Sequence, residues 1–83
     1  MRLPRDLSGD DLAQTLRQFG YRVTRQTGSH LRLTTVERGE HHITISKHDP
    51  LRIGTLAAIL RDVAEHFELS RQELVERLFG EGQ

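Results

Sequence analysis

The chain contains no cysteine and no tryptophan, and only two of its 83 residues are proline. The absence of cysteine excludes disulfides, thiolate nucleophiles and cysteine-ligated zinc. No apolar run approaches the roughly 18–20 residues that are needed to cross a bilayer. The first residues also have no apolar stretch of the signal-peptide type. These absences favour a cytoplasmic protein without a membrane partner, and the length allows one domain, residues 1–83.

Charge is balanced overall but unevenly distributed. The chain has twelve basic side chains, eleven of them arginine, and twelve acidic ones. Residues 1–60 hold nine basic and six acidic side chains, and residues 61–83 hold three basic and six acidic ones. The segment 17–32 carries four arginines and no acid. The planar fork of arginine suits phosphate, which makes this segment a candidate for phosphate binding. Ordinary solubilising charge is the alternative that composition alone favours, and zero net charge argues against strong nonspecific nucleic-acid binding.

Capping residues mark the helices. Ser8 and Asp11 have capping-box spacing, and Gly20 is a left-handed stop, which predicts a helix over residues 9–19. A second helix opens at Gly54-Thr55 and ends near Phe67. Its apolar stripe consists of Leu56, Ile59, Leu60, Val63 and Phe67. A second capping box, Ser70 with Glu73, predicts a third helix over residues 71–79 that Gly80 stops.

Between the first two helices the hydrophobic pattern alternates, which is typical of strands. Strands are predicted over residues 21–26, 30–36 and 41–46, with turns at 27–29 and 37–40. Two tight connections make an antiparallel meander. The predicted fold is therefore α+β, in the order α-β-β-β-α-α, with the helices on the apolar face of the sheet.

The other face of this sheet is expected to be polar, weakly basic and free of carboxylates. We call it the outer face, and strict alternation assigns it Arg22, Thr24, His30, Arg32, Thr34, His42, Thr44 and Ser46. It has no aromatic side chain, which argues against base stacking as in four-stranded RNA-binding sheets. Phe19 and Tyr21 are expected in the core.

Gly28-Ser29-His30, the later His48 and the stretch Gly54-Thr55-Leu56-Ala57-Ala58-Ile59-Leu60 occur in an order that resembles the HicA toxin family. The resemblance covers about residues 7–79. It implies a double-stranded-RNA-binding-domain-like fold, endoribonuclease activity on mRNA without metal or other cofactor, and neutralisation by a HicB-type antitoxin. It also implies that His30 is the catalytic residue. The usual Pro-x-His around the later histidine reads Ser46-Lys47-His48 here, which leaves the course of that loop open.

The implied chemistry is physically reasonable. RNA supplies its own nucleophile, the 2′-hydroxyl, and an imidazole that titrates near neutral pH can take its proton. Arg22, Arg25 or Arg32 could bind the phosphate and stabilise the charge that develops on it. The alternative for His30 is a surface histidine without a task.

The remaining candidates have plain structural alternatives. Gly28 is expected to give the turn its freedom in φ, or to let an RNA backbone approach. Ser29 caps the turn or donates to a phosphate. His48 contacts RNA, protonates the leaving oxygen or bonds only to local backbone. His41 and His42 should point to opposite sides of the strand and cannot easily share a metal, and His66 is expected to be solvated.

Two other functions stay open at this point. One is a noncatalytic RNA-binding module of the same fold. The other is an antitoxin-binding protein whose active site is vestigial, with its partner on the acidic C-terminal helices. Cleavage of RNA, and its dependence on His30, separates both from the nuclease.

Overall fold

The computed structural model describes residues 3–4 and 6–80. The elements follow the predicted order. They are α1 (Gly9–Thr15), a 3-10 turn η1 (Leu16–Phe19), β1 (Arg22–Thr27), β2 (His30–Thr35), β3 (His41–Ser46), α2 (Ile53–Phe67) and α3 (Arg71–Phe79). This order confirms the α+β fold class.

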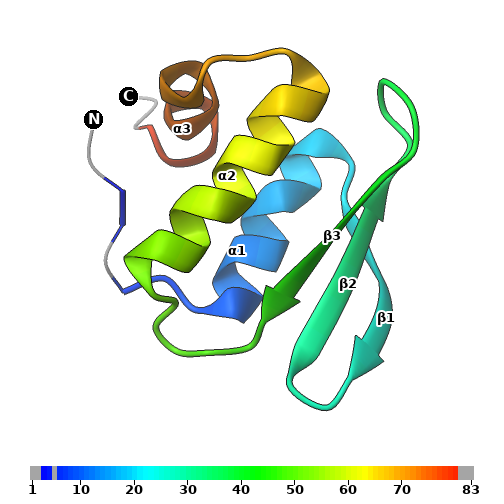
Figure 1. The fold of residues 1–83 in the computed structure, drawn as a ribbon, viewed down its shortest axis with the longest axis vertical. Helices are drawn as coiled ribbons and strands as arrows, with labels where there is room; N and C mark the ends of the chain where they lie inside the picture. Colours follow the sequence, from blue (N-terminus) through cyan, green and yellow to red (C-terminus); the bar gives the residue numbers. More distant parts are fainter. Residues whose placement is uncertain (1–2, 5, 81–83) are drawn as a thin grey trace.

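The three strands form one antiparallel sheet in the order β1-β2-β3, and the helices lie on one side of it (Figure 1). α1 and α2 contact the sheet through β3, and α3 packs against α2. The predicted inward residues of β2 and β3 and the apolar stripe of α2 meet in one buried core, which also takes in Phe19 and Tyr21. Every residue of β1, in contrast, is exposed.

The first helix begins and ends at the predicted residues but changes geometry on the way. The Ser8 hydroxyl accepts a hydrogen bond from the Asp11 N–H at 3.0 Å, and the Asp11 carboxylate accepts one from the Ser8 N–H at 3.3 Å. Its last four residues form the 3-10 turn η1, and the Gly20 N–H bonds to the Arg17 carbonyl at 2.9 Å. Gly20 then takes φ +84°, which glycine adopts without steric cost.

The capping box of α3 supports a stability prediction. The Ser70 hydroxyl accepts from the Glu73 N–H at 3.0 Å, and the Glu73 carboxylate accepts from the Ser70 N–H at 2.8 Å. Ser70→Ala should lower the free energy of unfolding by about 1 kcal/mol, because it leaves a helix N–H without its partner. Urea denaturation at pH 7 measures this loss, and an unchanged midpoint would contradict the cap.

The same cap has a pH signature. Hydrogen bonds from the Ser70 backbone and side chain hold the pKa of the Glu73 carboxyl below its ordinary value. A lowered folded-state pKa means that the stabilisation is present at neutral pH and is lost as the pH falls through the acidic range. Glu73→Gln removes the titrating carboxylate, so the difference in stability between wild type and Glu73→Gln should shrink on acidification.

Candidate functional site

The Gly-Ser-His motif forms the turn and the first strand residue at one end of the sheet. Thr27 and His30 are paired across a two-residue turn made by Gly28 and Ser29. Gly28 has φ +53°, while Ser29 stays at negative φ, the pattern of a type II′ turn. A Cβ on Gly28 would meet no atom within 4 Å. The turn therefore requires glycine for its backbone conformation, as predicted.

The loop that carries His48 is tied to this turn and to the start of α1. The Lys47 N–H donates to the Ser29 carbonyl at 2.7 Å, and the Gly9 N–H donates to the His48 carbonyl at 2.9 Å. Ser29, His30 and His48 are exposed, and among the described residues no side-chain hydrogen bond occupies any of them. Two histidines that lie 18 positions apart in sequence thus belong to the same end of the sheet.

A β-bulge changes which arginines belong to the outer face. The register shifts between Val23 and Arg25, so Arg25 lies opposite Arg32 instead of on the helix side, where strict alternation would place it. Directly opposed residues have Cβ atoms about 4.5–5.5 Å apart. Within the part of the chain that the structure describes, neither guanidinium is in an ion pair. The bulge therefore forms a pair of arginines with free donors.

Position along the strand decides which arginine can share a phosphate with His30. Arg32 is two residues further along β2 on the same face, about 7 Å away at the rise of a strand. Arg22 lies opposite Thr34, four residues from His30, or about 13 Å. The Arg25–Arg32 pair is consequently the arginine pair nearer to His30 on this face, while Arg22 lies toward the opposite end.

That opposite end holds a chain of side-chain hydrogen bonds across all three strands. The hydroxyls of Thr24 and Thr34 are 2.9 Å apart, and the Thr34 hydroxyl lies 2.7 Å from His42 Nδ1. His42 Nε2 in turn lies 2.9 Å from a carboxylate oxygen of Glu40. The expectation of a carboxylate-free face was therefore wrong at this end, because the hairpin loop folds Glu40 back onto it. No carboxylate pairs with the described residues at the His30 end.

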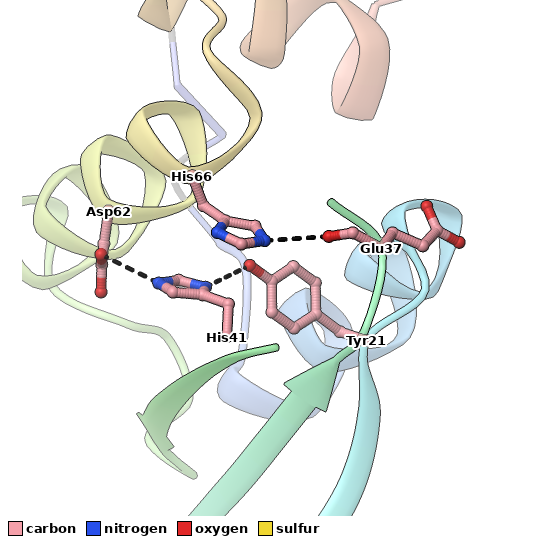
Figure 2. A network of polar contacts seen from close by, with 5 residues as sticks. All are labelled: Tyr21, Glu37, His41, Asp62 and His66. Carbon is pink, nitrogen blue, oxygen red and sulfur yellow. Dashed lines mark hydrogen bonds and ion pairs between the residues drawn. The ribbon is translucent and has the colours of Figure 1, made fainter. Parts of the chain in front are cut away.

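His41 points to the side of the sheet opposite to His42, as predicted. Its Nδ1 lies 2.6 Å from the Tyr21 hydroxyl and its Nε2 lies 3.2 Å from the Asp62 carboxylate (Figure 2). His66 stacks on His41 with ring centroids 4.4 Å apart and bonds to the Glu37 carbonyl at 2.9 Å. The prediction of a solvated His66 was wrong, since its ring joins α2 to the loop after β2.

Hydroxyl, imidazole and carboxylate follow one another in this cluster, as they do in activated nucleophiles. Tyr21, however, has no exposed surface, so no substrate reaches its oxygen. The cluster ties β1, β3 and α2 together and is structural. Among the described residues, no group of three or more His, Cys, Asp or Glu side chains is placed to hold a metal ion, and no helix is long and apolar enough to span a membrane.

The buried tyrosine can be titrated by itself, because the chain has one tyrosine and no tryptophan. Burial, and secondarily the negative charge of Asp62, raise the pKa of the Tyr21 hydroxyl above its ordinary value. Absorbance at alkaline pH should show tyrosinate only above the range of a free tyrosine. Because the raised pKa favours the neutral form, this contribution to stability is fully present below the ordinary pKa of tyrosine. It is lost as the pH rises from there through the raised pKa of the folded protein. A free-tyrosine titration curve in the folded protein would contradict the burial.

Fold and site together define a class: a small α+β protein with a three-stranded sheet. Its outer face carries an exposed histidine beside two opposed arginines that form no ion pair with the residues the structure describes. The family model described as the HicA toxin of bacterial toxin–antitoxin systems matches residues 9–64, well over half of the 83 residues. The chain belongs to the HicA toxin family. Comparisons with curated proteins and with solved structures gave no significant match.

Proposed function

We propose that this toxin is a metal-independent endoribonuclease of the cytoplasm, formed by one domain over residues 1–83, and that a HicB-type antitoxin neutralises it. The observation that carries the proposal is that His30 is exposed at the turn end of the outer face, about 7 Å along the strand from the Arg25–Arg32 pair. A phosphate between them would touch both the imidazole and a guanidinium. The HicA family membership supports the assignment to a toxin.

The cleavage step uses groups that RNA and this face supply. His30 takes the proton of a ribose 2′-hydroxyl, and that oxygen bonds to the adjacent phosphorus. The bond from phosphorus to the 5′-oxygen of the next nucleotide breaks, and this oxygen leaves with a proton. The products are a 2′,3′-cyclic phosphate and a 5′-hydroxyl. Arg25 and Arg32 stabilise the extra negative charge on the phosphoryl oxygens in the transition state.

The remaining predicted residues take supporting roles in this proposal. His48 protonates the leaving 5′-oxygen or binds the neighbouring phosphate. Gly28 keeps the turn free of a side chain, and the Ser29 hydroxyl donates to a phosphate. Arg22 contacts RNA about two nucleotides away from the cleaved bond. A metal ion has no assigned part, because the described residues at the His30 end of the face offer no cluster of carboxylate oxygens, the ligands that Mg²⁺ prefers.

The test is a cleavage assay with purified protein and a defined single-stranded RNA in excess EDTA. We expect cleavage, fragments with 2′,3′-cyclic phosphate and 5′-hydroxyl ends, and growth arrest when the chain is expressed in a bacterium. Cleavage that requires added divalent metal, or fragments with 3′-hydroxyl ends, would contradict the mechanism. Tight RNA binding without any cleavage would favour the noncatalytic module.

A further inference from the structure

One edge of the sheet is open. β1 is hydrogen-bonded to β2 alone among the described residues, and all six of its residues are exposed. The backbone N–H and C=O groups along a free edge can pair with a strand from another chain. Thr27 and His30 flank the two-residue turn and are hydrogen-bonded to each other. Hydrogen-bonded and non-hydrogen-bonded pairs alternate along an antiparallel ladder, so the neighbouring Gln26 directs its N–H away from β2 and toward this edge.

A groove runs beside this edge on the helix side. The helices pack on β3 and leave a space of about 510 Å³ between α1 and β1. Gln14 and Arg17 line it from the first helix, and Val23 and Gln26 line it from the strand, with Leu31 in the floor. Val23 is 50% exposed here, although it lies opposite Leu33 on the helix side of the sheet, where the inward residues of β2 and β3 are buried. The groove therefore presents apolar surface that a side chain could cover.

The two ends of the groove also differ in charge. α1 begins beside the loop of His48, at the turn end of β1, which places Asp10 at the Gln26 end of the groove. Arg17 precedes the connection into β1, which places it with Arg22 at the other end. Neither arginine is in an ion pair within the described residues. An extended segment with a carboxylate at one end and an apolar residue in its middle complements this arrangement.

We propose that an extended segment of the antitoxin protein binds here, as a fourth strand beside β1, with an apolar side chain on Val23 and a carboxylate on Arg17 and Arg22. The identity of the partner rests on the proposed function. A second copy of this chain fits poorly, because antiparallel pairing of two β1 strands brings Arg22 and Arg25 of one copy close to those of the other. RNA fits poorly as well, because it has no backbone amides to continue the ladder and Asp10 would repel its phosphates.

A strand bound in this way would also interfere with the proposed nuclease site. Alternate residues of the added strand point to the outer face, next to Arg25 in β1. A carboxylate there would occupy the guanidinium that the cleavage step needs. The antitoxin segment would thus block the substrate at Arg25 by adding a strand to the sheet.

The experiment uses the full chain and a fluorescently labelled, capped octapeptide. Its groove-facing alternate residues are valine, with glutamate at one end, and its other face carries glutamate toward Arg25. Binding is followed by fluorescence anisotropy and by amide chemical shifts. We expect saturable binding below about 1 mM, shifts confined to β1 and α1, and slowed exchange of the Gln26 amide. Val23→Lys and Gln26→Pro should each weaken binding at least tenfold. Val36→Lys is the matched control, because Val36 is 77% exposed outside the groove, and it should bind like wild type.

Several outcomes would overturn the proposal. These are no binding up to about 1 mM, equal binding of the same peptide with lysine in place of each glutamate, or shifts centred on α3. RNA cleavage is measured on the same variants, and Val23→Lys should keep it, because Val23 faces away from the outer face. A wild-type chain that binds the peptide but cuts no RNA refutes the nuclease alone, whereas a chain that cuts RNA but ignores the peptide refutes the docking edge alone.

Discussion

His30→Ala should lower the rate of RNA cleavage by about 10²–10⁴-fold, the usual contribution of a general acid–base group. The imidazole is exposed at the start of β2, so its removal opens no cavity, and surface substitutions of this kind change stability by about 0.5 kcal/mol or less. The rate is measured under single-turnover conditions with a labelled RNA. In a bacterium the same substitution should relieve growth arrest.

The matched control for this variant is His42→Ala. His42 is also an exposed histidine of the outer face, but it lies opposite Thr34, about 13 Å along β2 from the His30 position. It is also held by Thr34 and Glu40. Its removal should leave cleavage within a few fold of wild type. Equal losses in the two variants, or full activity of His30→Ala, would end the assignment of His30.

The same assay should distinguish the arginines beside His30 from Arg22. Arg25→Ala and Arg32→Ala are expected to slow cleavage, because each removes a donor to the phosphate next to His30. Arg22→Ala should raise KM more than it lowers kcat, because its contact lies outside the reacting group. The different response of Arg25 and Arg22 follows from the bulge and could not be anticipated from alternation in β1.

Local signals in the sequence predicted most of the fold. Capping boxes at Ser8 and Ser70, the stop at Gly20 and the apolar stripe of α2 are each decided within a few residues. The inward residues of β2 and β3 follow from strict alternation between tight turns. These features were predicted correctly because neighbouring residues alone determine them.

The errors share a different cause. The bulge at Thr24 depends on how β1 pairs with β2, and no residue in β1 marks it. His66 meets His41 across 25 positions of sequence, and Glu40 reaches the outer face only because the loop after β2 folds back. The exposed groove beside β1 results from where the helices lie on the sheet. Such features depend on contacts between distant segments, which periodicity does not report.

The structure also accounts for the neutral net charge of a protein proposed to bind RNA. The helices α2 and α3 with the turn between them, residues 53–79, carry five acidic and three basic side chains and lie on the helix side of the sheet (Figure 1). Three of the four arginines of the segment 17–32, namely Arg22, Arg25 and Arg32, lie on strands instead. The small excess of acidic groups in this segment of helices therefore lies on the helix side, and it does not oppose RNA on the outer face.

Gly9→Ala should be the most damaging single substitution for stability among the glycines outside turns. Gly9 is buried where α1 crosses the end of β3, and a Cβ there would overlap the Ser46 carbonyl oxygen and lie 3.0 Å from the Lys47 Cα. Both are backbone atoms, which cannot rotate out of the way. Relief requires α1 to move off the strand, which also stretches the bond from the Gly9 N–H to the His48 carbonyl. We expect a loss of about 3 kcal/mol, at the upper end for overpacking.

Thermal denaturation measures this loss, and for a chain of this size a change of 1 kcal/mol moves Tm by about 4–8 °C. Gly54→Ala is the matched control, because a Cβ on Gly54 meets nothing within 4 Å in the first turn of α2. That substitution should stabilise the protein by about 0.5–1 kcal/mol, since alanine loses less backbone freedom in a helix than glycine. Opposite signs for the two glycines are the decisive result. If Gly9→Ala proves neutral, α1 does not pack this closely on β3, and the loop that holds His48 beside the Gly28–His30 turn loses its anchor.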